Sequence, residues 1–346
     1  MEEIFSRLYQ QLQDGKPFSL YAKPGCTTVT ALFQKDTTAH SLTDFNGEGF
    51  VFAPFSGGAT AILPFTGADV ITVEFTQQAL VLEPSVNNPA GAEAKTNFES
   101  LVTLCVAEIK NGKFDKLVAS RTEFVGTDKS IAEIYTALLH TYPTAFRYCF
   151  YHPLTGLWMG ATPEQLLKAD GTTLHTVALA GTQLYNPDTE AVWETKEKEE
   201  QQFVTDYIIN RLNSLAEKVT ATAPYTFTAG NIVHIKTDIS AVLAGDTTLT
   251  HVIEKLHPTP AVCGLPKEAA RDFLIDNEGY EREYYSGFLG ELNRAGKSDL
   301  FVNLRSMKME HNRAQLFIGC GITKDSDPEK EFYETVNKSM TMRKVL

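Results

Sequence analysis

The sequence comprises 346 residues, of which 43% are hydrophobic and 21% charged, and these proportions are typical of a folded globular protein. Its formal net charge of -12 argues against binding to nucleic acid, because an acidic surface repels the phosphate backbone. The five cysteines form no C-x-x-C pair, which argues against disulfide or zinc frameworks and favours a reducing, cytoplasmic location. We expect no membrane partner, because no apolar run is long enough to span a bilayer and the acidic N-terminus does not resemble a signal peptide.

A short helix followed by antiparallel strands is predicted for the first part of the chain. Residues 2–13 have a helical pattern, and residues 18–83 contain short apolar runs broken by Gly, Pro and Asn, as in strands joined by turns. We expect residues 85–92, which contain Pro, Asn and Gly, to form a loop. A helix is predicted to follow over residues 95–111.

Strands interrupted by helices are predicted for the rest of the chain. Strands are expected at residues 114–121, 146–152, 157–161, 165–169, 172–180, 299–307 and 314–320. Helices are expected at residues 195–215, 249–256, 267–277 and 328–342. Asp170-Gly171 is a strong signal for a two-residue hairpin. Because the helices are inserted between runs of strands, the pattern predicts an α+β fold with large antiparallel sheets.

The helix predicted at residues 195–215 carries an acid on its apolar face. Extending that face by one turn before Val204 leads to Glu200. The other acids of residues 194–200 suit a solvated helix N-terminus, where the helix dipole favours negative charge. The same ordinary interpretation remains open for Glu200.

The last predicted helix carries a second acidic row. Ser326-Asp-Pro-Glu329 has the form of a capping box with proline in the first turn, and Glu331, Glu334 and Lys338 follow on one face. An exposed, salt-bridged face is one interpretation. The other is a Mg²⁺ site, because Mg²⁺ takes one or two protein carboxylates and leaves positions for water and an anionic substrate.

Three further features are candidates for binding or catalysis. Gly319-Cys-Gly321 ends a predicted strand, and its glycines allow backbone N–H groups to approach a ligand carboxylate; a tight turn is the alternative. Lys116 lies within a predicted strand and Glu164 follows a Gly160-Ala-Thr-Pro segment, so the two are candidates for a base and an acid. From these residues alone, a solvated lysine on an edge strand and an ordinary turn residue remain open.

Six segments, in family order, resemble the chorismate-binding enzyme family, which includes isochorismate, salicylate, anthranilate and aminodeoxychorismate synthases. They are residues 116–121 (KLVASR), 160–167 (GATPEQLL), 178–182 (ALAGT), 196–201 (KEKEEQ), 256–266 (LHPTPAVCGLP), and 319–322 (GCGI) together with 326–335 (SDPEKEFYET). Any one segment is a weak signal, but six in order over residues 114–338 are specific. The first 90 residues resemble the family only loosely.

The resemblance implies a fold of the anthranilate synthase component I type, in which two large antiparallel sheets have helices outside. It implies a single complex domain over residues 1–346, with an N-terminal β-rich part at residues 1–90 and a chorismate-binding catalytic region at residues 95–346. The substrate expected from the family is chorismate and the expected cofactor is Mg²⁺. We expect the chain to act as a monomer.

The resemblance also implies roles for individual residues. Lys116 is similar to the base that activates water for attack at ring C2, and Glu164 to the acid that protonates the departing C4 hydroxyl. Glu200 and Glu334 match the metal carboxylates, and Glu331 matches a nearby acid that binds directly or through water. The substrate-binding positions match His234, close to the ring, and Arg305, Lys338, Gly319, Gly321, Ala180 and Thr182.

Within the family, the pattern favours formation of isochorismate. The aminating branches commonly have Pro-Ile-x-Gly-Thr where this chain has ALAGT, and the aminodeoxychorismate branch has a lysine at the position of Ala180. One departure is Gln201, where the family often has histidine. The alternatives are a salicylate synthase that goes on to eliminate pyruvate, an aminating subunit that works with a glutamine amidotransferase, and an inactive chorismate-binding module. The matched base, acid and metal carboxylates are all present, which argues against the inactive module.

Overall fold

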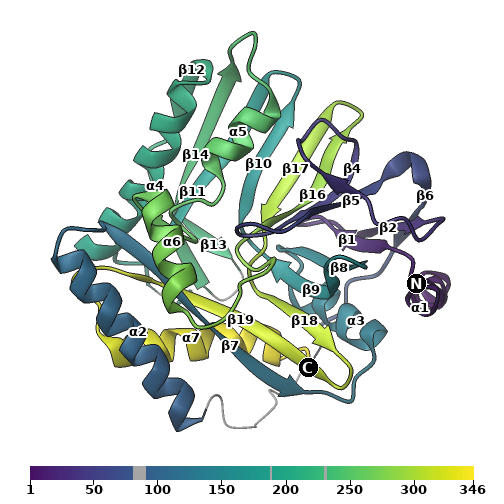
Figure 1. Cartoon of the computed structure of the whole chain (residues 1–346), viewed down its shortest axis with the longest axis horizontal. Coiled ribbons are helices and arrows are strands. Elements are labelled where there is room, and N and C mark those ends of the chain that lie inside the picture. Colours follow the sequence, from purple (N-terminus) through teal and green to yellow (C-terminus); the bar gives the residue numbers. More distant parts are fainter. Residues whose placement is uncertain (81–90, 188, 230–231) are drawn as a thin grey trace.

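Two large antiparallel β-sheets form the body of the molecule, and helices lie on their outer sides (Figure 1). The computed structural model describes residues 1–80, 91–187, 189–229 and 232–346, so most of the loop expected at residues 85–92 lies outside the described part. The predicted α+β class with two antiparallel sheets is confirmed. Among the described helices, none is both long and apolar enough to cross a membrane.

The first sheet has nine strands within the described residues, in the order β15-β7-β19-β18-β9-β8-β1-β2-β6. Its strands are β1 (Phe18–Ala22), β2 (Thr28–Gln34), β6 (Ala68–Glu74), β7 (Lys116–Gly126), β8 (Phe146–His152), β9 (Gly156–Thr162), β15 (Gly264–Leu265), β18 (Ser306–Glu310) and β19 (Arg313–Ile322). The long strands β7 and β19 pair so that Val118 lies opposite Gly321 and Ser120 opposite Gly319. This register brings residues from two distant family segments side by side.

The second sheet has the order β12-β14-β11-β10-β17-β16-β4-β5-β3, and β13 also pairs with β14. Its strands are β3 (Ser41–Leu42), β4 (Gly49–Ala53), β5 (Thr60–Pro64), β10 (Gln165–Asp170), β11 (Thr173–Leu184), β12 (Ala216–Ala221), β13 (Tyr225–Ala229), β14 (Ile232–Leu243), β16 (Phe288–Arg294) and β17 (Lys297–Val302). In this sheet, β4 from the beginning of the chain pairs with β16 from near its end, whereas in the first sheet β1 pairs with β8 from the middle of the chain.

The helices cover the outer faces of the sheets (Figure 1). They are α1 (Glu2–Asp14), α2 (Ala92–Lys110), α3 (Ile131–Thr141), α4 (Thr195–Asn213), α5 (Leu249–Leu256), α6 (Lys267–Asn277) and α7 (Pro328–Arg343), with a short 3-10 helix at Phe65–Gly67. Helix α4 packs on β11 and β14 of the second sheet, whereas α7 packs on β19 of the first and α2 packs on α7 and β7. The cavity described below is lined from α4 and α7 and from both sheets.

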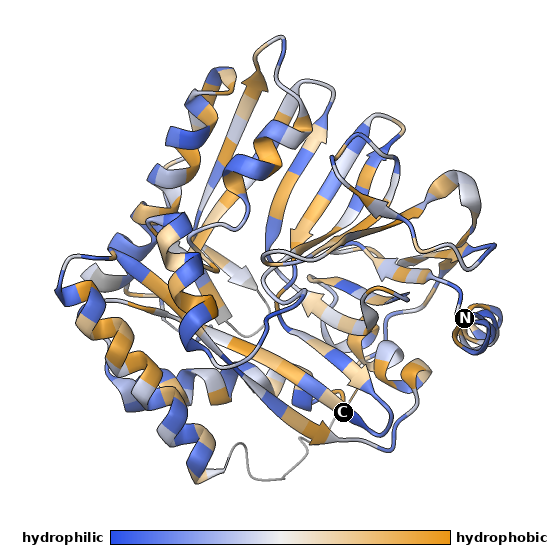
Figure 2. Cartoon of the chain, in the orientation of Figure 1, coloured by the Kyte–Doolittle hydropathy of each residue, from blue (hydrophilic) through white to orange (hydrophobic). Residues whose placement is uncertain are grey.

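Aromatic side chains join the two sheets. Phe146 of β8 and Phe301 of β17 stack with ring centroids 4.3 Å apart, and Phe52 of β4 contacts Tyr148 and Phe150 of β8. Burying an aromatic ring of this size contributes roughly 2–3 kcal/mol. Apolar residues concentrate on the strands, and hydrophilic residues on the loops and outer helix faces (Figure 2). The two sheets therefore share a buried, largely aromatic cluster.

Several predicted elements differ from the structure. The single strand predicted at residues 299–307 is wrong, because β17 in the second sheet ends at Val302 and β18 in the first begins at Ser306. Strand β16, helix α3 and the strands β12, β13 and β14 were not predicted. The capping box expected at Ser326 is also wrong: Asp327 is the N-cap of α7, and its carboxylate accepts a hydrogen bond from the backbone N–H of Lys330.

Candidate active site

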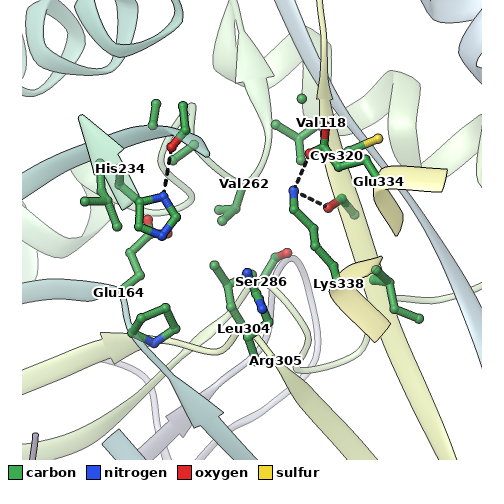
Figure 3. A pocket seen from close by; sticks show the side chains of 18 of the residues that line it. Val118, Glu164, His234, Val262, Ser286, Leu304, Arg305, Cys320, Glu334 and Lys338 are labelled. Carbon is green, nitrogen blue, oxygen red and sulfur yellow. Dashed lines mark hydrogen bonds and ion pairs between the residues drawn. The ribbon is translucent and has the colours of Figure 1, made fainter. Parts of the chain in front are cut away.

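A cavity of about 330 Å³ lies between the two sheets, α4 and α7. Ten residues expected from the sequence line it: Lys116, Glu164, Ala180, Glu200, His234, Arg305, Gly319, Gly321, Glu334 and Lys338. Figure 3 shows Glu164 and His234 on one side of the cavity and Lys338 and Glu334 on the other. Residues from segments far apart in the sequence therefore face one cavity.

Lys116 and Glu200 form an ion pair on one wall of the cavity. Lys116 begins β7 and is 1% exposed, and its Nζ donates to Glu200 Oε1 at 2.6 Å. Because β7 lies between β15 and β19, the alternative of a solvated edge lysine is wrong. Gly321 lies against this pair: a Cβ added there would be 2.5 Å from Glu200 Oε1 and 3.2 Å from Lys116 Cε. The glycine leaves the room that the two charged side chains occupy.

Glu164 comes from the turn between β9 and β10. Its backbone is fixed on both sides, because its N–H donates to Thr162 Oγ1 at 3.3 Å and its carbonyl accepts from the Val302 N–H at 2.9 Å. Burial raises the pKa of the Glu164 carboxyl to about 7, against the opposing effect of Lys116 and Lys338. Near neutral pH, a large fraction of this side chain is therefore protonated and able to donate a proton.

His234 lies on β14, facing the same side of the cavity as Glu164 (Figure 3). Its Nδ1 donates to the carbonyl oxygen of Gly181 at 2.8 Å, because a carbonyl can only accept. Burial lowers the pKa of His234 to about 4, although the bond to Gly181 favours the protonated form. The ring is therefore neutral at neutral pH, with the proton on Nδ1.

Lys338 and Glu334 lie one turn apart on α7. Lys338 Nζ donates to Glu334 Oε1 at 2.7 Å and to the carbonyl of Gly319 at 3.1 Å. Burial alone lowers the pKa of Lys338, but the Glu334 carboxylate outweighs it, so that the pKa lies above its ordinary value. Lys338 is thus a cation at every physiological pH, and it ties the strand end at Gly319 to α7.

Two predicted site residues do not join this group in the described structure. Glu331 is 4% exposed and does not line the cavity. The side chain of Thr182 lies outside the described part, although its backbone belongs to β11. The structure also adds Glu194 and Glu197 to the lining. Glu194, Glu197 and Glu200 follow one another at intervals of three residues, and this spacing is the signal that could have identified the first two.

The cavity contains more acidic than basic side chains. Its formally cationic members are Lys116, Arg305 and Lys338, whereas its acidic members are Glu164, Glu194, Glu197, Glu200 and Glu334. With Glu164 protonated and His234 neutral, four carboxylates face three cations. An anionic ligand with two charges would therefore meet repulsion unless a further cation bound with it.

Comparison with known proteins places the chain in a family. The family model described as "Chorismate binding enzyme" matches residues 71–346. A salicylate biosynthesis isochorismate synthase of Pseudomonas aeruginosa is 31% identical over 274 residues, covering 74% of this chain and 56% of that protein. The isochorismate synthase MenF of Escherichia coli K12 is 32% identical over 268 residues, covering 73% of this chain and 60% of MenF. The matched part thus spans less than two thirds of the length of these relatives.

The fold is also found in a solved structure. The structure of DhbC from Bacillus anthracis, described as a 2,3-dihydroxybenzoate-specific isochorismate synthase, superimposes with a TM-score of 0.81. The superposition covers 97% of this chain and 98% of that chain, at 22% sequence identity. The structural likeness therefore includes the N-terminal strands, which the family model does not reach. From the family match over most of its length, we conclude that the chain belongs to the chorismate-binding enzyme family.

Proposed function

We propose that this protein is an isochorismate synthase, which isomerises chorismate by adding water at ring C2 and removing the hydroxyl at C4. The observation that carries the proposal is that Lys116 and Glu164 face one cavity, and that the pKa of the Glu164 carboxyl is raised to about 7. A base and a protonated acid are what this exchange requires. The names of the relatives are consistent with the activity.

The proposed exchange balances its atoms and protons. Lys116 removes a proton from a water molecule as the water oxygen bonds to C2, and the ring double bonds shift as the C4–O bond breaks. Glu164 donates its proton to the departing hydroxyl, which leaves as water. One water enters and one leaves, so the product is an isomer of the substrate. Because Lys116 is ion-paired with Glu200, the amine becomes available for this role only when Glu200 has another cationic partner.

The charges of the cavity support a divalent cation as the cofactor. Chorismate is a dianion, and it would enter a cavity in which four carboxylates already face three cations. Glu200 and Glu334 lie on different helices and both face the cavity, a donor set suited to a hard cation. Among the residues that the structure describes, no three His, Cys, Asp or Glu side chains are arranged to hold a metal. Mg²⁺ needs only one or two carboxylates, because water and substrate complete its coordination.

We therefore propose that Glu200 and Glu334 hold Mg²⁺, with Glu331 as a buried acid near this end of α7. When bound, Mg²⁺ would neutralise a carboxylate of chorismate and act as a Lewis acid. Arg305 and Lys338 would bind the substrate carboxylates by charge-assisted hydrogen bonds. We propose that His234, Gly319, Gly321 and Thr182 complete the substrate site.

The side chain at position 180 affects whether water or ammonia attacks the ring. Ala180 lines the cavity and presents a methyl group where the aminodeoxychorismate branch has a lysine. Water is a weak nucleophile and needs a base such as Lys116, whereas ammonia needs none. We therefore expect hydroxylation at C2 with the enolpyruvyl side chain retained.

A product assay tests the proposal. Purified protein is incubated with chorismate, Mg²⁺ and excess ammonium at mildly alkaline pH, and the products are separated. We expect isochorismate to approach a constant ratio with chorismate from either direction, and no turnover in excess EDTA. A dominant aminated ring would overturn the proposal. Salicylate with stoichiometric pyruvate would instead identify a salicylate synthase.

A further inference from the structure

Arg305 differs from Lys116 and Lys338, the other two cations of the cavity, in the group to which it donates a hydrogen bond. Lys116 and Lys338 each pair with a carboxylate, at 2.6 Å and 2.7 Å. Arg305 instead donates from Nη1 to the hydroxyl oxygen of Thr341 at 2.6 Å. Within the described part of the chain, no carboxylate lies within salt-bridge distance of Arg305. Its positive charge is therefore held in place without being neutralised.

The backbone of Arg305 is fixed by close packing. Arg305 has a φ of 47°, a conformation uncommon for a residue with a side chain. Its carbonyl accepts a hydrogen bond from the Ala161 N–H at 3.0 Å, and a Cβ at Gly160 would lie 2.9 Å from that carbonyl oxygen. With its backbone defined in this way, the long side chain still has several rotatable bonds. The contact with Thr341 restricts them.

Thr341 is itself anchored, and it does not line the cavity. It lies near the end of α7, and its carbonyl accepts a hydrogen bond from the Tyr142 hydroxyl at 2.6 Å. Tyr142 directly follows α3. Burial raises the pKa of Tyr142 to about 12, so the hydroxyl keeps its proton and remains a donor. The chain of contacts thus runs from α3 through Thr341 to a guanidinium at the cavity wall.

We propose that Thr341 is a positioning residue, which aims the guanidinium of Arg305 at a carboxylate of the substrate. The inference rests on the proposed function and extends it to a residue outside the cavity. A neutral hydroxyl suits this role, because it accepts one N–H and leaves the full charge and the remaining donors of the guanidinium for an anion. An aspartate or glutamate here would form an ion pair with Arg305 and compete with the substrate.

The test compares Thr341→Val, which keeps the shape and removes the acceptor, with Thr341→Ser, which keeps the acceptor. For Thr341→Val, we expect KM for chorismate to rise about tenfold, as for the loss of one charge-assisted hydrogen bond, with kcat changed much less. Thr341→Ser should retain a KM close to that of the wild type. In an Arg305→Ala background, Thr341→Val should raise KM no further, because the group that it positions is gone.

Thr335→Val is the matched control on the same helix. Thr335 also accepts a hydrogen bond from an arginine, Arg121 Nε at 2.7 Å, but neither residue lines the cavity. Thr335→Val should lower the melting temperature and leave KM unchanged. Chorismate binding, measured by calorimetry with Mg²⁺ present, accompanies the kinetics and reports on affinity without turnover.

The outcomes separate this inference from the proposed function. If the wild type forms isochorismate but Thr341→Val is folded and has the wild-type KM, the positioning role is overturned and the function stands. The positioning role is also overturned if Thr341→Ser raises KM as much as Thr341→Val does. The same holds if Thr341→Val raises KM equally in the Arg305→Ala background. If the wild type binds chorismate without forming isochorismate, and Thr341→Val binds it more weakly, the positioning role is supported and the proposed function fails.

Discussion

Gly321 lies against the ion pair between Lys116 and Glu200, and any side chain there must displace one of the two. A Cβ would be 2.5 Å from the Glu200 carboxylate, so we expect Gly321→Ala to lower kcat/KM on the order of 10²-fold, as for a displacement of about 1 Å in catalytic groups. Gly126→Ala, in the same sheet, is the control: its Cβ would meet only Asn312 O at 3.9 Å, and its activity should match the wild type. A folded Gly321→Ala with full activity would show that this pair has no catalytic role.

The carboxyl of Glu164 predicts a pH dependence. A general acid must carry its proton, and the pKa of Glu164 is raised to about 7 by burial. We therefore expect kcat/KM for chorismate to fall as the pH rises through about 7, because this ratio reports ionisations of the free enzyme. Glu164→Gln should lower the rate 10²–10⁴-fold and remove this decline from the remaining activity. Persistence of the same decline in the variant would assign it to another group.

The two proposed metal carboxylates should differ in their effect on stability. Glu200→Ala removes the carboxylate that pairs with Lys116, which is 1% exposed, and breaking such a buried pair costs about 3 kcal/mol. The Glu334 side chain is 44% exposed, so Glu334→Ala should cost less than about 1 kcal/mol. Turnover should be nearly abolished in both. Urea unfolding measures the loss of stability, and assays over a series of Mg²⁺ concentrations measure the loss of turnover. If either variant is activated by Mg²⁺ like the wild type, the substituted residue is not a metal ligand.

The sequence predicts the boundaries of helices more accurately than it predicts which strands pair in the sheets. Helices α5 and α6 begin and end at the predicted residues, and the 3.6-residue period places Glu200 and Glu334 on faces that reach the cavity. A strand pattern carries no information about which strand lies beside it. The sequence therefore leaves open whether Lys116 lies on an edge strand, because the neighbouring strand β19 comes from a distant part of the chain.

The elements that were missed have identifiable reasons. Helix α3 is buried at Ile134, Tyr135 and residues 137–139, so its sequence lacks a clear polar stripe. Its capping box, Ser130 with Glu133, was a visible signal. The crossing between β17 and β18 contains neither glycine nor proline, and Arg305 adopts its positive φ without either. No local pattern marks the point where the chain changes sheets.

Gln201 links α4 to the second sheet by hydrogen bonds, beside the apolar contacts of the helix. Its Nε2 donates to Thr205 Oγ1 on the helix and to Thr237 Oγ1 on β14, each at 2.8 Å. Gln201→Leu removes both bonds and leaves buried hydroxyls without this donor, at a cost of about 1–3 kcal/mol. We expect a lower melting temperature and a higher Mg²⁺ concentration for half-maximal activity, because the helix carries Glu200.

The neighbouring glutamine provides the control for this variant. Gln202 is exposed and bonds only along the helix, to Asp206 Oδ1 at 2.7 Å, so Gln202→Leu should alter neither property. If both leucine variants show the same Mg²⁺ response, the bond to β14 does not position Glu200.

At the scale of the whole molecule, the N-terminal strands are integral to both sheets. Strand β1 pairs with β8 in the first sheet, and β4 pairs with β16 in the second. A fragment of residues 95–346 would expose both of these strand edges and the aromatic rings of β8 that Tyr21, Phe50 and Phe52 contact. We propose one domain over residues 1–346, and we expect the fragment to be insoluble or to lack a cooperative unfolding transition by circular dichroism. A soluble fragment that unfolds cooperatively would instead establish residues 95–346 as an independent domain.

The pairing of β7 with β19 has a consequence for the newly made protein. Lys116 leaves the ribosome long before Gly321, and Glu334, Lys338 and Thr341 follow later still on α7. Until these residues emerge, β7 has no β19 beside it, and the nascent chain has the base of the proposed reaction without the strand and helix that complete its wall of the cavity. We therefore expect binding of chorismate to begin only after α7 has emerged and has docked. A ribosome stalled before residue 328 would carry most of both sheets and still have no substrate site.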